Sequence, residues 1–154
     1  MMLELHNVTI GQLIRELSLT VNEGRMVCVS GPQGSGKTTL LRAVLGFLPI
    51  DDGFISIDGE LLTPQSAPYF RRQMAYVPQQ LSLPEGSTEV QTDYLWLLNR
   101  AIESGKQLLI IDEPQSHLSS EEYWEVDRLL MDAARKGMTI LAVNDRITQN
   151  QIQL

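Results

Sequence analysis

Eight consecutive residues, Gly31 to Thr38, read GPQGSGKT and match the pattern G-x-x-x-x-G-K-[ST]. The glycines of this pattern allow successive main-chain N–H groups to point toward phosphate oxygens. Lys37 then reaches the β and γ phosphates, and the Thr38 hydroxyl ligates Mg²⁺. The pattern therefore predicts a site for a nucleoside triphosphate, made by Gly31, Pro32, Gln33, Gly34, Ser35, Gly36, Lys37, Thr38 and Thr39.

A second group of candidate residues is acidic. The apolar residues 108–111 are followed by Asp112, Glu113 and Pro114. Such a run is typical of a strand buried on both faces of a parallel sheet, which delivers its last side chains at the carboxyl edge. Taken alone, it would more often lead into an exposed turn. With the phosphate loop upstream, it predicts that Asp112 holds Mg²⁺ and that Glu113 polarises the attacking water.

The elements that position the loop follow from the pattern of apolar residues. Residues 25–29 (RMVCV) predict a buried strand that ends at the loop, and Cys28 is expected to be a core residue of that strand. Residues 39–45 place apolar side chains at helical spacing directly after the loop. The loop is therefore expected to join a strand to a helix, which is the context that its pattern requires.

A small antiparallel portion is predicted on both sides of this unit. Leu17, Leu19 and Val21 alternate with polar residues, as in a half-buried strand. Residues 54–57 predict another strand, and Asp58-Gly59 after them is a favoured hairpin turn.

Further along the chain, the pattern returns to alternating helices and strands. Ser119 or Ser120 is expected to cap a helix that continues to about residue 136 and stops at Gly137. Residues 138–143 predict one more core strand. The predicted fold class is α/β, specifically a three-layer P-loop sandwich with a mostly parallel central sheet and a small antiparallel β portion near the N-terminus.

Composition and charge limit the classes of function. At 154 residues and 43% hydrophobic content, we expect one domain spanning residues 1–154. A net charge of -7 argues against nucleic acid as a partner. No run approaches the roughly 18 apolar residues that span a membrane, and no secretory leader is evident. A cytoplasmic protein is therefore expected, with no membrane segment of its own.

Three longer stretches resemble the nucleotide-binding domain of the ATP-binding cassette (ABC) family. Residues 16–62 are similar to the family's opening, MAYVPQQ at 74–80 is similar to its Q-loop, and LNRAIESGKQLLIIDEP at 98–114 resembles its Walker-B region. The resemblance covers most of residues 3–145. It implies that Gln79 senses Mg²⁺ and the attacking water, so that the predicted metal ligands are Thr38, Gln79 and Asp112.

The chain also departs from the family pattern. The Ser-Gly-Gly-Gln signature is absent, and residues 87–91 (STEVQ) stand closest to it. Between Gln79 and Asp112 there is room for only one helix, from about 92 to 103, so the family's helical subdomain is expected to be largely deleted. Its switch histidine falls at Asn144, which can donate a hydrogen bond but has no titratable proton.

The resemblance implies Mg²⁺-dependent ATP hydrolysis that drives transport or another assembly, slowly in the absence of a partner. The candidate catalytic residues are Lys37, Gln79, Glu113 and Asn144. The implied partner is a membrane-embedded transporter subunit or a second ABC-type subunit, which would hold this protein at the inner face of a membrane. The missing signature leaves an alternative open, namely a regulatory module that binds ATP or ADP without hydrolysing it.

The remaining unusual side chains have structural interpretations. Trp96 is expected to pack in the core, with exposure as a partner surface by the truncated subdomain as the alternative, and Trp124 is expected on the inner face of its helix. His6 and His117 are too isolated to suggest a metal site, so no metal other than Mg²⁺ is expected.

Overall fold

A computed structural model describes residues 1–32, 34–78, 94–112, 119–144 and 151–154. Their elements, in chain order, are β1 (Leu3–Ile10), β2 (Ile14–Val21), β3 (Met26–Ser30), α1 (Lys37–Val44), β4 (Asp52–Ile57), β5 (Glu60–Leu61), α2 (Ala67–Arg71), β6 (Met74–Val77), α3 (Tyr94–Glu103), β7 (Leu108–Asp112), α4 (Ser120–Arg135), β8 (Thr139–Asn144) and β9 (Gln151–Gln153).

The larger sheet has five strands in the order β6-β7-β8-β3-β9, and every pair of neighbours is parallel. The four residues from Leu108 to Ile111 in β7 are all buried, as are all six residues of β8. These short apolar strands are covered on both faces, which is typical of a parallel sheet between helices. Because the strands are parallel, the carboxyl ends of β3, β6, β7 and β8 lie along the same edge.

The smaller sheet is antiparallel and has the order β2-β1-β4-β5. Along β1, buried residues alternate with more exposed ones, so one face of this sheet points into the core. Gly53 in β4 has a φ of +79°, and a Cβ there would lie only 2.2 Å from the Asn7 carbonyl oxygen. Only glycine allows β4 to pass so close to the irregular part of β1.

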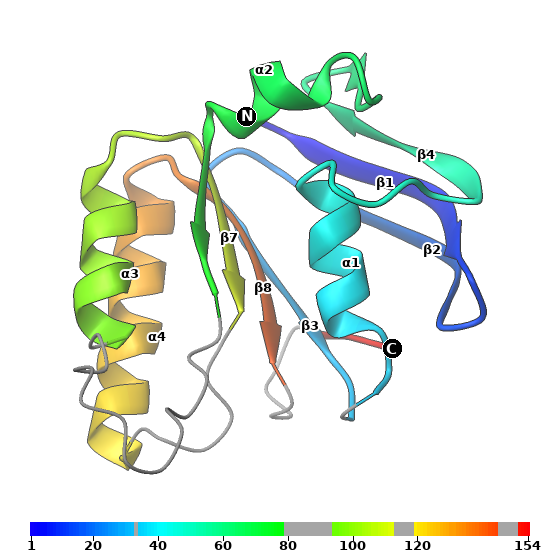
Figure 1. Cartoon of the computed structure of the whole chain (residues 1–154). Coiled ribbons are helices and arrows are strands. Elements are labelled where there is room, and N and C mark those ends of the chain that lie inside the picture. Colours follow the sequence, from blue (N-terminus) through cyan, green and yellow to red (C-terminus); the bar gives the residue numbers. More distant parts are fainter. Residues whose placement is uncertain (33, 79–93, 113–118, 145–150) are drawn as a thin grey trace, which may run out of the picture.

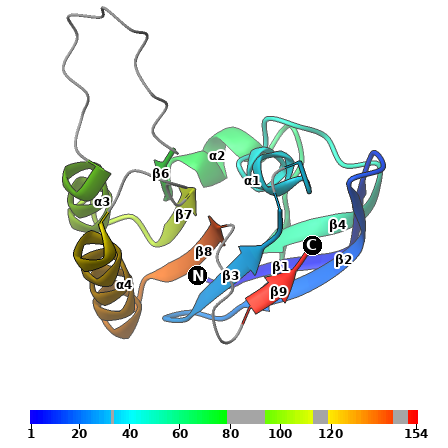
Figure 2. The same cartoon turned by 90° about the horizontal axis from the view of Figure 1, so that it is seen from below.

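The helices divide between two faces of the parallel sheet. Figure 1 shows α3 and α4 side by side on one face and α1 on the other, between the two sheets. In Figure 2 these helices are seen nearly end-on, with α3 and α4 together on one side of the molecule and α1 apart from them, next to α2. Two apolar cores result from this arrangement. One joins α1 to both sheets, and the other joins α3 and α4 to the opposite face of the parallel sheet.

Most of the predicted elements are confirmed. The α/β class, the parallel sheet, the antiparallel portion near the N-terminus and the turn at Asp58-Gly59 are all present. Ser119 caps α4, and Gly137 follows its end. Within the described residues, α3 is the one helix between β6 and β7. That residues 1–154 form a single domain stays a prediction.

The predictions that Trp96 and Trp124 pack inward are wrong, and for Trp96 the alternative of exposure holds. Trp96 is 50% exposed and Trp124 is 79% exposed. In α3 the buried positions are Tyr94 and Leu98, and Trp96 lies between them on the outer side, where the Arg100 guanidinium stacks 4.9 Å from its ring centre. The inner face of α4 is formed by other residues, namely Val126, Leu130 and Ala133.

Candidate nucleotide-binding site

The GPQGSGKT loop connects β3 to α1 at the carboxyl edge of the parallel sheet. The Gly31 N–H donates to the Asn144 carbonyl oxygen at 3.3 Å, which fastens the start of the loop to β8. Lys37 begins α1 and is only 8% exposed, and its Nζ donates back to the Gly31 carbonyl oxygen. The lysine side chain is therefore folded along the inside of the loop, where phosphate oxygens are expected to lie.

The first turn of α1 suits an anion. Its N-cap, Gly36, offers no side-chain hydrogen bond, and no acidic residue lies in the first turn. The α4 helix contrasts with it, because Ser119 and Glu122 form a capping box there and Glu121 adds a second carboxylate. The N–H groups that begin α1 have no such partner in their own helix, and they add to the positive end of the helix dipole.

The loop glycines and Ser35 support this interpretation. A Cβ on Gly31 would lie 2.4 Å from the Ser35 hydroxyl oxygen, so a larger residue would fill the inside of the loop. Gly34 and Gly36 have φ values of +84° and +101°, in the left-handed region that favours glycine. The buried Ser35 Oγ has no hydrogen-bond partner among the described residues. A buried hydroxyl of this kind calls for a polar ligand, and a phosphate oxygen fits it.

Asp112 lies at the end of β7, on the same sheet edge as the loop. The strand order places β8 between β7 and β3, so Asp112 stands about 10 Å along the sheet from the start of the loop, at two strand spacings. The prediction that Asp112 and the loop lie at the same edge of the sheet is confirmed.

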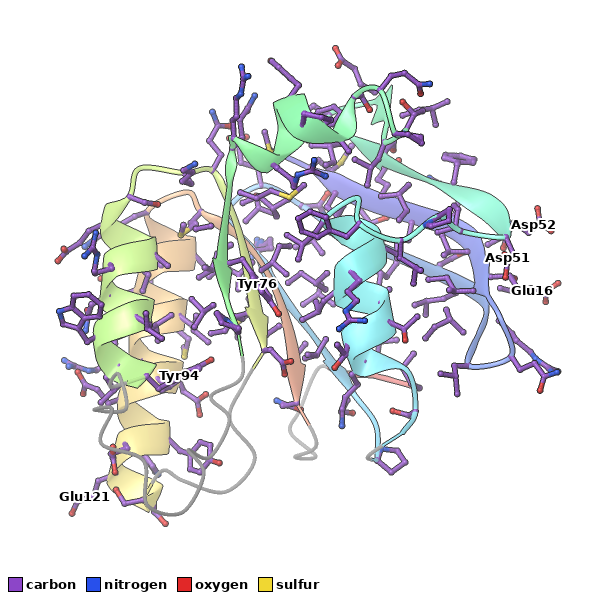
Figure 3. All side chains as sticks on the ribbon, viewed as in Figure 1. Glu16, Asp51, Asp52, Tyr76, Tyr94 and Glu121 are labelled. Carbon is purple, nitrogen blue, oxygen red and sulfur yellow. The ribbon has the colours of Figure 1, made fainter. Side chains whose placement is uncertain are left out.

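Two tyrosines near Asp112 were not singled out from the sequence. Tyr76, on β6, is labelled in Figure 3 and is 43% exposed. Burial, and after it the nearby Asp112 carboxylate, raise the pKa of its hydroxyl, whereas Arg42 on α1 acts in the opposite direction. Tyr94 donates its hydroxyl to the Asp112 main-chain oxygen at 2.9 Å. Nothing in the sequence indicates this contact.

Asn144, at the position expected for a switch residue, ends β8 beside the start of the loop. It pairs with Ser30 in the sheet and is 3% exposed. Its Nδ2 donates to the Cys28 Sγ at 2.9 Å, so part of the amide is directed into the sheet toward β3. Cys28 is buried, as predicted.

Several predicted site residues lie outside the described residues, namely Gln33, Gln79 and Glu113, together with the signature remnant at 87–91 and His117. Pro78 precedes Gln79 at the end of β6, and Asp112 precedes Glu113 at the end of β7. The roles of Gln79 and Glu113 stay predictions.

The residues at this edge fit a site in which Mg²⁺ is held jointly by the protein and by phosphate oxygens. Within the described part of the chain, no group of three or more His, Cys, Asp or Glu side chains could hold a metal ion. Mg²⁺ differs from metals that need such a group, because it is usually held by one or two protein ligands, phosphate oxygens and water. Thr38, in the first turn of α1, and Asp112 are oxygen donors of the kind that Mg²⁺ prefers.

Comparison with protein families gives a match over most of the chain. The family model described as ABC transporter matches residues 14–152. The Fe(3+) ions import ATP-binding protein of Pectobacterium atrosepticum is 40% identical over 84 residues, which cover 51% of this chain and 24% of that protein. The vitamin B12 import ATP-binding protein of Yersinia pseudotuberculosis is 27% identical, over 92% of this chain and 75% of that protein.

Solved structures agree with these matches. The ADP conformation of an ATP-binding cassette of an ABC transporter superimposes with a TM-score of 0.76 at 17% identity, covering 96% of this chain and 82% of that one. This likeness shows that the fold is that of a nucleotide-binding cassette. No helix in the described residues is long and apolar enough to cross a membrane.

Proposed function

The chain belongs to the ABC transporter family, and from that premise we propose that it is a Mg²⁺-dependent ATPase that supplies energy to a partner assembly. Its function within the family is ABC-type ATP binding. The observation that carries the proposal is the shared sheet edge, which holds the buried Lys37, the uncapped start of α1 and the carboxylate of Asp112.

Each residue has a proposed part in binding. Main-chain N–H groups of the loop and of the first turn of α1 donate to the phosphates of ATP. Lys37 exchanges its contact with the Gly31 carbonyl for the β and γ phosphates, which it holds by charge. Thr38 and Asp112 hold Mg²⁺, and the cation draws negative charge from the phosphate oxygens when it is bound.

The proposed hydrolytic step uses residues outside the described part of the chain. Glu113 would accept a proton from the attacking water, and Gln79 would orient that water. Asn144 would contribute one hydrogen bond near the terminal phosphate and no proton of its own. Hydrolysis is therefore proposed to be slow until a partner completes the site.

The partner belongs to the same proposal. The relatives quoted above are named as import ATP-binding proteins, and by analogy the partner proposed here is a membrane-embedded transporter subunit or a second ABC-type subunit. Such a partner would hold the protein at the cytoplasmic face of a membrane.

Titration calorimetry with Mg·ATP, run in parallel with phosphate release, tests the proposal. Lys37→Ala should lose ATP binding, and Glu113→Gln should bind ATP without releasing phosphate. Lys106→Ala is a matched control, because this lysine also donates to a main-chain oxygen, that of Arg72, but lies before β7 at the opposite edge of the sheet. Equal ATP affinity in Lys37→Ala and Lys106→Ala would refute the proposed site.

A second candidate function is a module that binds ATP without turning it over. The orientation of Asn144 favours it, since Nδ2 is directed to the Cys28 sulfur. ATP binding by the wild type, with phosphate release no faster than in Glu113→Gln even when a partner is present, would select this candidate.

A further inference from the structure

One side chain joins the second core directly to the end of β7. Tyr94 is the first residue of α3 and is 1% exposed. Its ring packs in the core that α3 and α4 form with the parallel sheet, together with Leu98 one turn later. The hydroxyl reaches the Asp112 main-chain oxygen at 2.9 Å. A helix 18 residues earlier in the chain is thus hydrogen-bonded to the last residue of the strand.

The contact lies where the sheet ladder ends. The pairing of β7 with β6 stops at Ile111↔Val77, and its pairing with β8 stops at Asp112↔Val143. Asp112 is therefore paired with a residue of β8 but with none of β6. The Tyr94 hydroxyl adds a hydrogen-bond donor at that point. The carbonyl carbon that receives it and the Cβ that carries the carboxylate are bonded to the same Cα, so a fixed carbonyl also fixes the direction in which the side chain leaves the main chain.

We propose that Tyr94 is a positioning residue that aims the Asp112 carboxylate at Mg²⁺ through this main-chain hydrogen bond. The inference rests on the proposed function, in which Asp112 is a metal ligand. Groups that orient a metal ligand commonly change metal affinity by about 10- to 100-fold when they are removed. Because Tyr94 acts on the main chain of the ligand, the effect is expected near the lower end of that range.

A purely structural role would give a different result. A buried tyrosine hydroxyl needs a hydrogen-bond partner in any protein core, and its loss would lower stability without selecting one ligand. A positioning role changes the contribution of Mg²⁺ and leaves the contacts of the phosphates with the loop unaltered. The two roles are separated by the ratio of ATP affinities measured with Mg²⁺ and with EDTA.

The test compares Tyr94→Phe with wild type by calorimetric titration of ATP in both conditions. We expect the ratio to fall by about tenfold in Tyr94→Phe, through weaker binding with Mg²⁺ and unchanged binding in EDTA. Tyr69→Phe is the matched control, since it removes an exposed hydroxyl from α2, and its ratio should equal that of wild type. Thermal unfolding of each variant establishes that it is folded at the temperature of titration.

A double-mutant cycle identifies the path of the effect. In an Asp112→Asn background, Tyr94→Phe should change the ratio no further, because the carboxylate that it aims has been removed. If Tyr94→Phe does not fold, a ring-fluorinated tyrosine at residue 94 replaces it. This residue keeps the ring and makes the hydroxyl a stronger donor, so the ratio should change while the EDTA affinity stays constant.

The outcomes separate this inference from the function on which it rests. A wild type that binds ATP more tightly with Mg²⁺, together with an unchanged ratio in the residue-94 variant, would overturn the role of Tyr94 and leave the proposed function standing. A further fall of the ratio in the Asp112→Asn background would also overturn it. A wild type that binds no ATP, or binds it equally in both conditions, would overturn both.

Discussion

Replacing Gly36 with alanine should cost more stability than replacing Gly34, although both glycines belong to the same loop. Both have positive φ values, so an alanine at either position has a left-handed backbone, which costs about 1–2 kcal/mol. The two sites differ in their surroundings. A Cβ on Gly34 would meet nothing within 4 Å, whereas one on Gly36 would lie 3.0 Å from Ile14 Cδ1 and 3.1 Å from Leu13 Cβ.

The contact at Gly36 is difficult to relieve. Ile14 is buried at the start of β2, in the core that α1 shares with both sheets, so it has little room to retreat. Overpacking of this kind typically costs about 1–3 kcal/mol. Gly36→Ala should therefore destabilise the protein by about 2–5 kcal/mol, against about 1–2 kcal/mol for Gly34→Ala.

Urea unfolding followed by circular dichroism measures this difference. Alanine also reduces the freedom of the unfolded chain, but it does so equally at both positions, so this effect cancels in the comparison. Equal losses of unfolding free energy in the two variants would refute the reasoning. They would mean that Leu13 and Ile14 can move away from a Cβ at residue 36 without cost.

Three further predictions concern Tyr76, Ser119 and Cys28. Because burial and then Asp112 raise the pKa of Tyr76 above its ordinary value of 10.0, the folded state keeps a proton that the unfolded state has released. The unfolding free energy should therefore fall as the pH rises above about 10. Between about pH 9 and 11, the unfolding free energy of Tyr76→Phe should fall less than that of wild type, and identical pH dependence would contradict this. Ser119→Ala removes the α4 capping box and should cost about 1 kcal/mol, or about 2–4 °C in Tm, whereas the neighbouring Ser120→Ala should change Tm little. Cys28 is buried, so its thiol should react with Ellman's reagent only as the protein opens, and ATP at about 100 times its Kd should slow that reaction by about 100-fold; a fast reaction of the native protein would contradict its burial.

The parts of the fold that depend on local patterns could be predicted from the sequence. The GPQGSGKT loop needs a strand before it and a helix after it, and both are present as β3 and α1. Ser119 is a strong N-cap because Glu122 follows it at the spacing of a capping box. In each case the residues that determine the structure are neighbours in the chain.

The side chains that face outward on α3 and α4 could not be predicted as well. Residues 94–98 are Tyr-Leu-Trp-Leu-Leu, and a run of five apolar residues gives no phase by itself for deciding which of them faces the sheet. The structure turns Tyr94 and Leu98 inward, and Trp96 stacks with Arg100 instead. Which of these side chains faces the core depends on how the helix packs against the sheet, and the five residues alone do not determine it.

The same distinction applies to the candidate site. Lys37 and Asp112 could be assigned from motifs because their chemistry requires a particular residue at a particular end of an element. The contacts that hold them come from elsewhere in the chain. The Gly31 N–H is bonded to the end of β8, and the Asp112 carbonyl is bonded to the start of α3. A parallel sheet brings these distant residues to one edge, so a motif predicts which groups can act there, and the packing of α3 and β8 determines how firmly each one is aimed.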